Sequence, residues 1–280
     1  MPELPEVETL ARDLRRLLLG AEFKAVEVLW PRAVAMPTPD ELVQYLPGHK
    51  IRDVSRRGKF LLLSLSGASY LLIHLRMSGQ LRVEPTTAPP CNDTPGKVDR
   101  HARLIFHLSD GRRLVFSDPR KFGRVYWIAD PAQVVGNLGP EPLAEDFTLD
   151  AFADLLSRHK GAIKPLLLNQ ALLAGLGNIY TDEALFLAGL LPSRRANTLS
   201  PAETERLYAA IREVLQQAIG NRGTTLADER YHDAEGQPGR HRESLRVYHR
   251  SGEPCPRCST PIQRTKVGGR GTHFCPNCQK

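Results

Sequence analysis

Most of the cysteines in this chain lie close to its C-terminal end. Four of the five form two Cys-x-x-Cys pairs, Cys255/Cys258 and Cys275/Cys278, with 16 residues between the pairs. Two such pairs at this spacing are typical of a tetrahedral zinc site with four thiolate ligands. Because cysteine fills every coordination position, we predict one structural Zn²⁺ per chain and no catalytic metal. Two separate redox pairs are the alternative, but no thioredoxin-like βαβ pattern accompanies them.

The segment between the two pairs is basic and rich in glycine. Residues 264–273 read RTKVGGRGTH, which predicts a hairpin tip suited to phosphate contact. Taken alone, the tip fits a solvated basic turn equally well. The fifth cysteine, Cys91, stands in a predicted loop, and we assign it no role.

The N-terminal residues offer a second kind of chemistry. The chain begins Met1-Pro2-Glu3, and initiator methionine is normally removed before a residue as small as proline. Removal exposes a secondary α-amine, and such a group, with a pKa near ~8, is roughly a quarter unprotonated at pH 7.5. With an aldehyde-type carbon it forms a cationic iminium, which is an electron sink for eliminations. Without further motifs, a proline at the start of a helix is the simpler interpretation.

A helix followed by short strands is predicted behind this terminus. Residues 5–19 place Val7, Leu10, Leu14, Leu17 and Leu18 on one helical face. Between residues 50 and 128 come β-type runs at 59–65, 70–75, 103–108, 113–117 and 124–128. Hairpins are expected at Gly67, Asp110-Gly111 and Asp118-Pro119, and the Pro-rich residues 84–100 are expected to form a surface loop. This half is predicted to be a β-sandwich behind one helix.

The second half is predicted to be helical. Residues 136–148 are rich in Gly and Pro and mark a domain boundary. Ser200-Pro201-Ala202-Glu203 is a capping box that opens a helix to about Ile219. The polar stretch from Asn221 to Arg250 is too long for a tight turn and is predicted to be a mobile or ligand-gated loop.

Composition excludes several classes of protein. The 280 residues are 41% hydrophobic and 25% charged, as in a globular protein. No stretch reaches the ~20 apolar residues of a membrane span, and no signal-peptide core is present, so we expect a cytoplasmic protein without membrane contact. The net charge of +7 predicts attraction to a polyanion, with nucleic acid as the first candidate.

The motifs, in their order along the whole chain, resemble bacterial formamidopyrimidine-DNA glycosylase. They are MPELPEVET, RRGKF, HLRMSG, DPRKFG, LGPEPL, GLGNIYTDEALF, GTTL and the terminal four-cysteine finger. The resemblance implies an α+β fold: an N-terminal β-sandwich with a leading helix (1–135), a helix-two-turn-helix domain (136–223), a loop over the everted base (224–244) and a zinc finger (245–280).

The resemblance also implies an activity. Family members are bifunctional DNA glycosylases and abasic-site lyases of base excision repair. They remove 8-oxoguanine and ring-opened formamidopyrimidines through a Schiff base on the N-terminal proline and then a β,δ-elimination. We therefore expect damaged double-stranded DNA as the partner of a monomer in the bacterial cytoplasm, associated with the nucleoid when on DNA.

Four residues match catalytic positions of the family. Pro2 corresponds to the nucleophile and Glu3 to the general acid, which is one residue away and reaches the same carbon at little entropic cost. Lys59 corresponds to the strand lysine that holds phosphate and assists proton transfer, although a lysine there also protects a strand edge. Arg270 corresponds to the finger arginine near the second elimination. Glu6 either supports the site or compensates the helix dipole.

Other residues match positions that contact DNA. Flipping a base out leaves a hole in the stack, and Met77 corresponds to the residue that fills it. Arg120 and Phe122 correspond to the residues that face the orphaned base and wedge the step, and an arginine can donate two hydrogen bonds to cytosine. Without the family, Met77 and Phe122 would be interpreted as core residues.

Contacts to the DNA backbone are implied for a further group. Asn178 precedes a helix and could offer its amide and the helix N-terminus to a phosphate, or could simply cap the helix. Lys160 and His101 match contact positions, and His74 and Lys121 are weaker phosphate candidates. His74 could equally be a satisfied core histidine.

The sequence departs from the family at three places. Arg76 in HLRMSG and His249 in VYHR stand where glycine is usual, and the loop 226–244 lacks an aromatic residue that often follows its second glycine. Two rival functions remain. An endonuclease VIII-like glycosylase prefers oxidised pyrimidines, but that subfamily typically has glycine where this chain has Leu4. A catalytically silent DNA-binding protein is disfavoured by the intact Pro2, Glu3 and Lys59.

Overall fold

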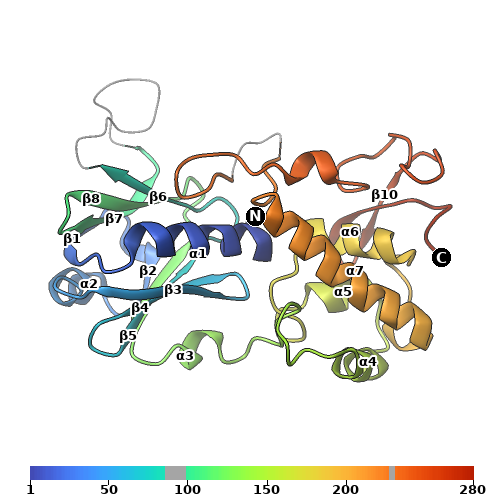
Figure 1. Ribbon diagram of the computed structural model, residues 1–280, viewed down its shortest axis with the longest axis horizontal. Coiled ribbons are helices and arrows are strands. Elements are labelled where there is room, and N and C mark those ends of the chain that lie inside the picture. The colour runs from blue at the N-terminus through green and yellow to red at the C-terminus, as the bar shows by residue number, and fades with distance from the viewer. Residues whose placement is uncertain (86–98, 227–230) are drawn as a thin grey trace. The chain divides into compact units, whose positions relative to one another are not determined.

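The computed structural model describes residues 1–85, 99–226 and 231–280 (Figure 1). The chain forms two compact units. The first comprises Met1–Gly136 and Arg222–Arg240, and the second comprises Asn137–Asn221 and His241–Lys280. In the described part of the chain, no helix is long and apolar enough to cross a membrane.

The first unit opens with helix α1 (Leu4–Leu18), which confirms the predicted helix. Its buried face includes Val7, Leu10, Leu14 and Leu18. The N-cap is Glu3, whose backbone N–H donates to the Glu6 carboxylate over 2.8 Å, so the first turn is held by a side chain of the helix itself.

Two sheets follow α1. The four-stranded sheet has the order β1 (Phe23–Val28), β7 (Ala102–Leu108), β8 (Arg112–Ser117) and β6 (Gln80–Pro85). The five-stranded sheet has the order β2 (Val34–Met36), β9 (Arg124–Ile128), β5 (Ser69–His74), β4 (Phe60–Leu65) and β3 (Ile51–Arg57). Phe106 and Phe116 from one sheet share a core with Leu61 and Ile73 from the other and with Leu14 of α1. The predicted β-sandwich behind a leading helix is therefore confirmed.

Two of the three predicted hairpins are present in the structure. Hairpins at Gly67 (β4–β5) and at Asp110-Gly111 (β7–β8) are confirmed, and both glycines have positive φ angles. The predicted hairpin at Asp118-Pro119 is wrong, because β8 and β9 belong to different sheets. Asp118 accepts hydrogen bonds from the backbone N–H groups of Phe122 and Gly123, which stabilise a crossing loop instead of a tight turn.

Four strands were not among the predicted runs. They are β1, β2, β3 and β6, and neither β1 nor β3 alternates strictly between buried and exposed residues. The shorter helices of this unit are η1 (Pro31–Ala33), α2 (Pro39–Tyr45) and α3 (Ala132–Val135). Residues 86–98 of the predicted loop, with Cys91, and residues 227–230 lie outside the described part of the chain.

The second unit is mainly helical, as predicted. Its elements are α4 (Leu149–Ser157), α5 (Ile163–Leu168), α6 (Asn178–Ala188), η2 (Ala196–Thr198), α7 (Pro201–Gly220), η3 (His241–Ser244), β10 (Gln263–Val267) and β11 (Arg270–Phe274). The capping box is confirmed, because the Glu203 N–H donates to Ser200 Oγ and the Ser200 N–H donates to the Glu203 carboxylate. Strands β10 and β11 pair as the expected hairpin.

The stretch from Asn221 to Arg250, predicted to be a mobile or ligand-gated loop, makes specific contacts in its described residues. Thr224 bridges to Arg240, and His232 bridges to Pro238. The Arg222 guanidinium donates to both Asp13 of α1 and Asp233, each over 2.6 Å. The Val83 N–H of β6 donates to the Ala234 carbonyl. Ion pairs and backbone hydrogen bonds therefore join residues 222–226 and 231–240 to the first unit, although the composition of the segment is polar and glycine-rich.

Candidate catalytic and DNA-contact sites

The N-terminal residues of the first unit lie around one buried carboxylate. Pro2 is buried, and Glu3 and Glu6 are only 2% and 1% exposed. One Glu6 oxygen accepts the Glu3 N–H and the other accepts the Thr224 N–H, both over 2.8 Å. Glu6 thus connects the terminus to the GTTL motif and does more than compensate the helix dipole.

Glycine is required beside this carboxylate. Gly223 has a φ of +81°, and an added Cβ would lie 2.9 Å from Glu6 Oε1. Tyr231 also belongs to this cluster, since its hydroxyl donates to the Glu6 carbonyl over 3.4 Å. Burial, with the nearby Glu6 charge, raises the pKa of Tyr231 well above its usual value. No sequence motif indicated Tyr231.

Lys59 and His74 lie at adjacent ends of the neighbouring strands β4 and β5. Lys59 directly precedes β4 and is 6% exposed, which does not fit a solvated lysine that protects an edge. Phe60 pairs in register with His74. Burial, with the Arg76 and Lys59 cations, lowers the pKa of His74 to about 3. His74 is therefore neutral, and its Nδ1 accepts the Arg76 N–H over 3.0 Å, which supports the core-histidine interpretation.

Met77 and Phe122 are not core residues. Their side chains are 39% and 47% exposed, and Arg120 is exposed as well. The Arg120 guanidinium lies 5.0 Å from the centroid of the Phe122 ring. Lys121 Nζ lies 4.0 Å from the Trp30 ring centroid, so this cation stacks on an aromatic face.

The loop that carries Arg120 and Phe122 is joined to the turn that carries Met77. Buried Asp118 accepts from the Ser78 hydroxyl over 2.5 Å and from the backbone N–H groups of residues 120, 122 and 123. The structure thus brings Met77, Arg120 and Phe122 onto connected loops. Asp118 and Ser78 were missed as site residues, although both stand inside the quoted motifs. His101 is half-buried next to this loop, and its carbonyl accepts the Asp118 N–H.

Both departures from glycine fall at left-handed backbone positions. Arg76 has a φ of 56° and His249 a φ of 61°. Residues with a Cβ are disfavoured in this conformation by roughly 1–2 kcal/mol, which is a physical reason for glycine at both places. The two side chains therefore occupy backbone conformations that glycine adopts without strain.

In the second unit, α6 holds the finger hairpin. The Asn178 amide donates to the Gly271 carbonyl over 2.9 Å, and its Oδ1 is buried without a hydrogen-bond partner among the described residues. Lys164, which is fully buried, donates to Asp182 over 2.6 Å and to the same carbonyl over 2.9 Å. The N-cap of α6 is Gly177, so Asn178 is not the capping residue. Lys160 and Arg270 are exposed and available to a ligand.

The four cysteines form a compact cluster in this unit. Their Sγ atoms lie within 4.8 Å of one another, with 3.9 Å between Cys255 and Cys278 and 3.5 Å between Cys258 and Cys275. Zn–S bonds of about 2.3 Å in a tetrahedron place the sulfurs about 3.8 Å apart. The residues therefore fit the predicted metal, and the finger holds one structural zinc.

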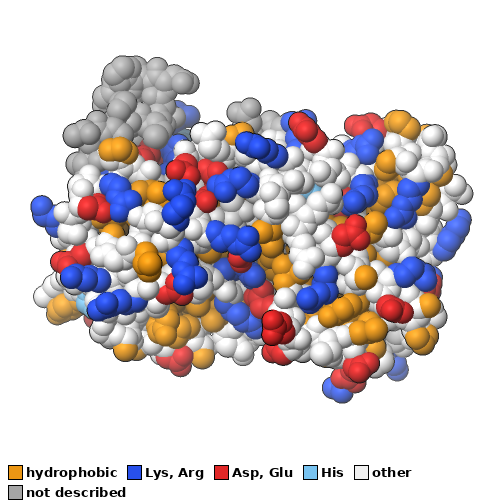
Figure 2. All heavy atoms as spheres, viewed as in Figure 1, with side chains coloured by type: hydrophobic (Ala, Val, Ile, Leu, Met, Phe, Trp, Pro, Cys, Tyr) orange, Lys and Arg blue, Asp and Glu red, His pale blue; other side chains and the backbone are white. Residues whose placement is uncertain are grey.

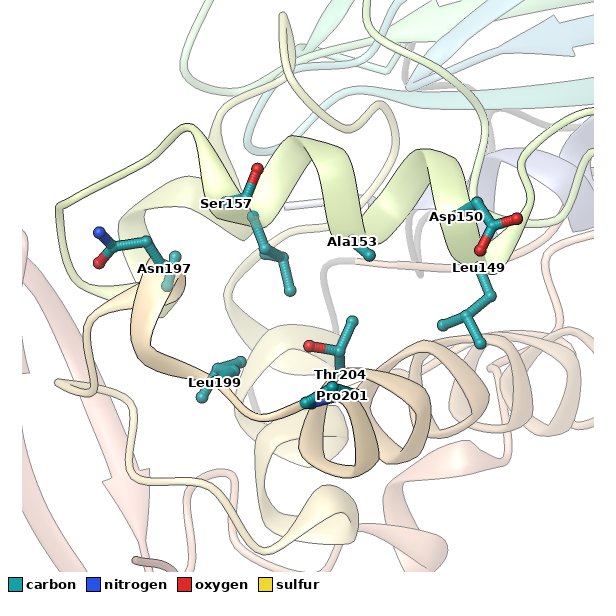
Figure 3. A pocket seen from close by; sticks show the side chains of 10 residues that line it. Leu149, Asp150, Ala153, Ser157, Asn197, Leu199, Pro201 and Thr204 are labelled. Atoms are coloured by element: carbon teal, nitrogen blue, oxygen red, sulfur yellow. The ribbon is translucent and has the colours of Figure 1, made fainter.

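Two other features are a cavity in the second unit and the distribution of surface charge. A cavity of about 260 Å³ lies between α4 and the start of α7 (Figure 3) and is lined by Leu149, Asp150, Ala153, Leu156, Ser157, Ala196, Asn197, Leu199, Pro201 and Thr204. Lys and Arg side chains are interspersed with acidic ones on the face seen in Figure 2. Arg12, Arg15 and Arg16 of α1 are ion-paired, so these cations are already partly neutralised.

Comparison with known protein families covers nearly the whole chain. Residues 1–125 match the formamidopyrimidine-DNA glycosylase N-terminal domain, residues 138–229 its H2TH domain, and residues 252–280 the zinc finger found in FPG and IleRS. The chain belongs to the formamidopyrimidine-DNA glycosylase family. The formamidopyrimidine-DNA glycosylase of Pelotomaculum thermopropionicum is 46% identical over 100% of this chain and 99% of its own.

Solved structures of formamidopyrimidine-DNA glycosylases agree with this assignment. A complex between the Lactococcus lactis glycosylase and DNA containing an abasic site has a TM-score of 0.90 and 38% identity, over 99% of both chains. A complex of the same enzyme with Fapy-dG DNA has a TM-score of 0.88 and 37% identity, over 99% of this chain and 100% of the other. This glycosylase chain is accordingly an enzyme of base excision repair with the family's α+β architecture.

Proposed function

We propose that this glycosylase removes oxidised purines, both formamidopyrimidines and 8-oxoguanine, from damaged duplex DNA and then cleaves the abasic site. The buried Pro2–Glu3 pair, fixed through Glu6, is the observation that carries the proposal. The Lactococcus lactis relative, in complexes with Fapy-dG DNA and with abasic-site DNA, supports the same substrate class. The net charge of +7 also favours binding to DNA.

The chemistry begins when removal of Met1, which is 49% exposed, leaves a secondary amine on Pro2. The amine nitrogen forms a bond to C1′ of the damaged nucleotide as the glycosidic bond breaks, and the proton that the amine loses balances the one that the departing base takes up. Glu3 gives its proton to the ring oxygen as the sugar opens, and a cationic iminium results. Loss of the C2′ proton then expels the 3′ phosphate, and a second elimination expels the 5′ phosphate. We assign Lys59 to the first proton transfers and Arg270 to the phosphate of the second elimination.

The remaining assignments follow from exposure and position. Met77 fills the space left by the flipped base, Phe122 wedges the neighbouring step and Arg120 donates to the opposite cytosine, and all three side chains are exposed. The proposed phosphate ligands are Lys160, Asn178, His101 and Lys121, whereas His74, which is buried and neutral, is assigned to the core and not to a phosphate.

The segment 224–244 is proposed to cover the everted base, because its first residue is bonded to the Glu6 carboxylate beside Pro2 and Glu3. The proposed domains comprise residues 1–135, 136–223 and 245–280. Each chain carries every proposed catalytic group, so a monomer suffices.

Borohydride trapping tests the nucleophile. With a duplex that contains 8-oxoguanine opposite cytosine, we expect one covalent adduct, mapped to the peptide that begins at Pro2. Pro2→Gly, or an N-terminal extension that blocks the amine, should abolish trapping, base release and strand cleavage but leave lesion binding largely intact. An adduct on a lysine, or normal turnover by the blocked protein, would contradict the assignment.

A further inference from the structure

The loops that carry the proposed DNA-probing side chains depend on one buried group. Asp118, at the end of β8, is 1% exposed. Its Oδ1 accepts from the Ser78 hydroxyl over 2.5 Å and from the Arg120 N–H over 3.2 Å, while its Oδ2 accepts from the Phe122 and Gly123 N–H groups, each over 2.7 Å. A buried carboxylate is tolerated only when such donors replace its hydration.

These contacts need both carboxylate oxygens. An asparagine at this position would turn an NH₂ group toward at least one of the N–H or O–H donors, because an amide has only one oxygen. The packing around the carboxylate is tight, since a Cβ added to Gly123 would lie 3.3 Å from Asp118 Oδ2 and 2.3 Å from the Phe116 ring. Between these bonded residues, Lys121 adopts a left-handed conformation with a φ of 61°. The hydrogen bonds to Asp118 offset the cost of that conformation.

The exposed side chains lack such support of their own. Arg120 is exposed and contacts the equally exposed Phe122 ring, so the orientation of the pair is set by its backbone. That backbone is bonded to Asp118 on both sides of Lys121. Ser78, which is 4% exposed and follows Met77, connects the same carboxylate to the turn 75–79. Forty residues apart in sequence, the two loops thus share a single anchor.

We propose that Asp118 and Ser78 are positioning residues that hold the turn 75–79 and the loop 118–123 as one rigid body. This body sets Arg120 against the base opposite the lesion and thereby determines opposite-base specificity. The inference rests on the proposed function, because it takes Arg120 as the residue that reads the orphaned base. Neither Asp118 nor Ser78 contacts DNA in this assignment.

The test compares excision of 8-oxoguanine opposite cytosine and opposite adenine at fixed salt. We expect Asp118→Asn and Ser78→Ala each to lower the cytosine-to-adenine ratio of kcat/KM by roughly tenfold, toward the ratio of Arg120→Ala. Adding Asp118→Asn to Arg120→Ala should lower it no further, since the carboxylate acts through Arg120. Ser69→Ala is the matched control, because it removes a buried hydroxyl that accepts from Trp127 in the same unit.

A second readout separates positioning from folding. Borohydride trapping of an abasic site in a single strand requires the nucleophile but offers no opposite base, so Ser78→Ala should be trapped like wild type at a temperature below its thermal midpoint. Ser78→Thr, which keeps the hydroxyl, should restore the ratio. Ser78→Ala also keeps the test decisive if Asp118→Asn does not fold.

The other outcomes are distinct. If Arg120→Ala changes the ratio while Asp118→Asn and Ser78→Ala do not, the positioning role is wrong and the proposed function stands. If trapping falls in parallel with the ratio in Ser78→Ala, the pair is merely structural and the inference is overturned. If Arg120→Ala itself leaves the ratio unchanged, the proposed reading of the opposite base and the inference built on it both fall.

Discussion

Two buried carboxylates hold the backbone of the proposed site in place. Glu6 holds the N–H groups of Glu3 and Thr224, and Asp118 holds those of the loop that carries Arg120. Each is almost completely buried, so replacing either with an apolar residue would leave backbone donors unsatisfied at about 1–3 kcal/mol apiece. The proposed reactive groups therefore depend on residues that do not react.

The role of Glu3 gives a prediction with two substrates. Glu3→Gln cannot donate a proton to the sugar oxygen, so base excision should fall by 10²-fold or more, within the usual range for general acid catalysis. Cleavage of a preformed abasic site should be retained in part, since no glycosidic bond remains to break. The test is to measure the rates of Glu3→Gln and wild type on both substrates. An equal loss of rate on both would show that Glu3 is structural and not the general acid.

His74 predicts a pH dependence of stability. Its pKa is about 3 in the folded protein against 6.5 for an unperturbed histidine, chiefly because of burial. Below pH 6.5 the unfolded chain takes up a proton that the folded protein does not, so the stability from neutral His74 is present above pH 6.5 and is lost as the pH falls toward 3. At pH 5 the loss approaches about 2 kcal/mol.

Urea unfolding of wild type and His74→Gln at pH 7.5 and pH 5 measures this effect. Glutamine can still accept the Arg76 N–H but does not titrate, so the variant should lose less stability on acidification. His241, whose pKa burial lowers to about 4, is present in both proteins and cancels in the comparison. Identical pH dependence would show that His74 is protonated freely in the folded state.

At the scale of the element, α6 organises the second unit through two adjacent acids. Asp182 accepts from Lys164 and from the His273 N–H of β11. Glu183 accepts from the N–H groups of residues 246, 247 and 248, and burial raises its pKa. One helix therefore fixes both the finger hairpin and the segment that leads into the finger.

The finger should depend on its metal despite these contacts. Chelation removes the metal, and Cys275→Ser removes one of its thiolate ligands. Because few apolar residues surround the site, residues 255–278 should lose their fold in either case. We expect at least a tenfold loss of DNA affinity and the loss of one zinc per chain by elemental analysis. Cys91→Ser is the matched control and should bind zinc and DNA normally. A fully active preparation without zinc would contradict the prediction.

Electrostatics act at the scale of the whole molecule. The net charge is +7, yet several cations of α1 are ion-paired, and the exposed cations that we assign to phosphates are Lys160 and Arg270. If each contacts a phosphate, neutralising it should weaken damaged and undamaged duplexes alike. The two residues differ in this way from Arg120, whose loss should matter mainly opposite the lesion.

Salt dependence measures the number of phosphate contacts. Lys160→Ala and Arg270→Ala should each reduce the slope of log K against log salt by about 0.9, the value for one contact with duplex DNA. Lys24→Ala removes an exposed lysine of β1 to which we assign no contact, so its slope should equal that of wild type. An unchanged slope in Lys160→Ala or Arg270→Ala would remove that residue from the interface.

The sequence by itself determined the features that depend on near neighbours. Helix α1, the capping box at Ser200, the hairpins at Gly67 and Gly111 and the four-cysteine cluster all rest on residues a few positions apart or on a fixed ligand spacing. Backbone conformation and metal geometry act at this range. From the order of the motifs we could also predict the family and the β-sandwich behind its leading helix.

Only the tertiary structure decided what depends on distant partners. Glu6 meets Thr224 across 218 residues, and Ser78 meets Asp118 across 40. Asp118 also accounts for the wrong hairpin prediction, because its bonds to the Phe122 and Gly123 N–H groups form a crossing loop, and Arg222 ties a polar segment to Asp13 across 209 residues. Local sequence preferences do not predict burial and hydrogen bonding of this kind, because a carboxylate can accept hydrogen bonds from distant donors only after folding has brought them together.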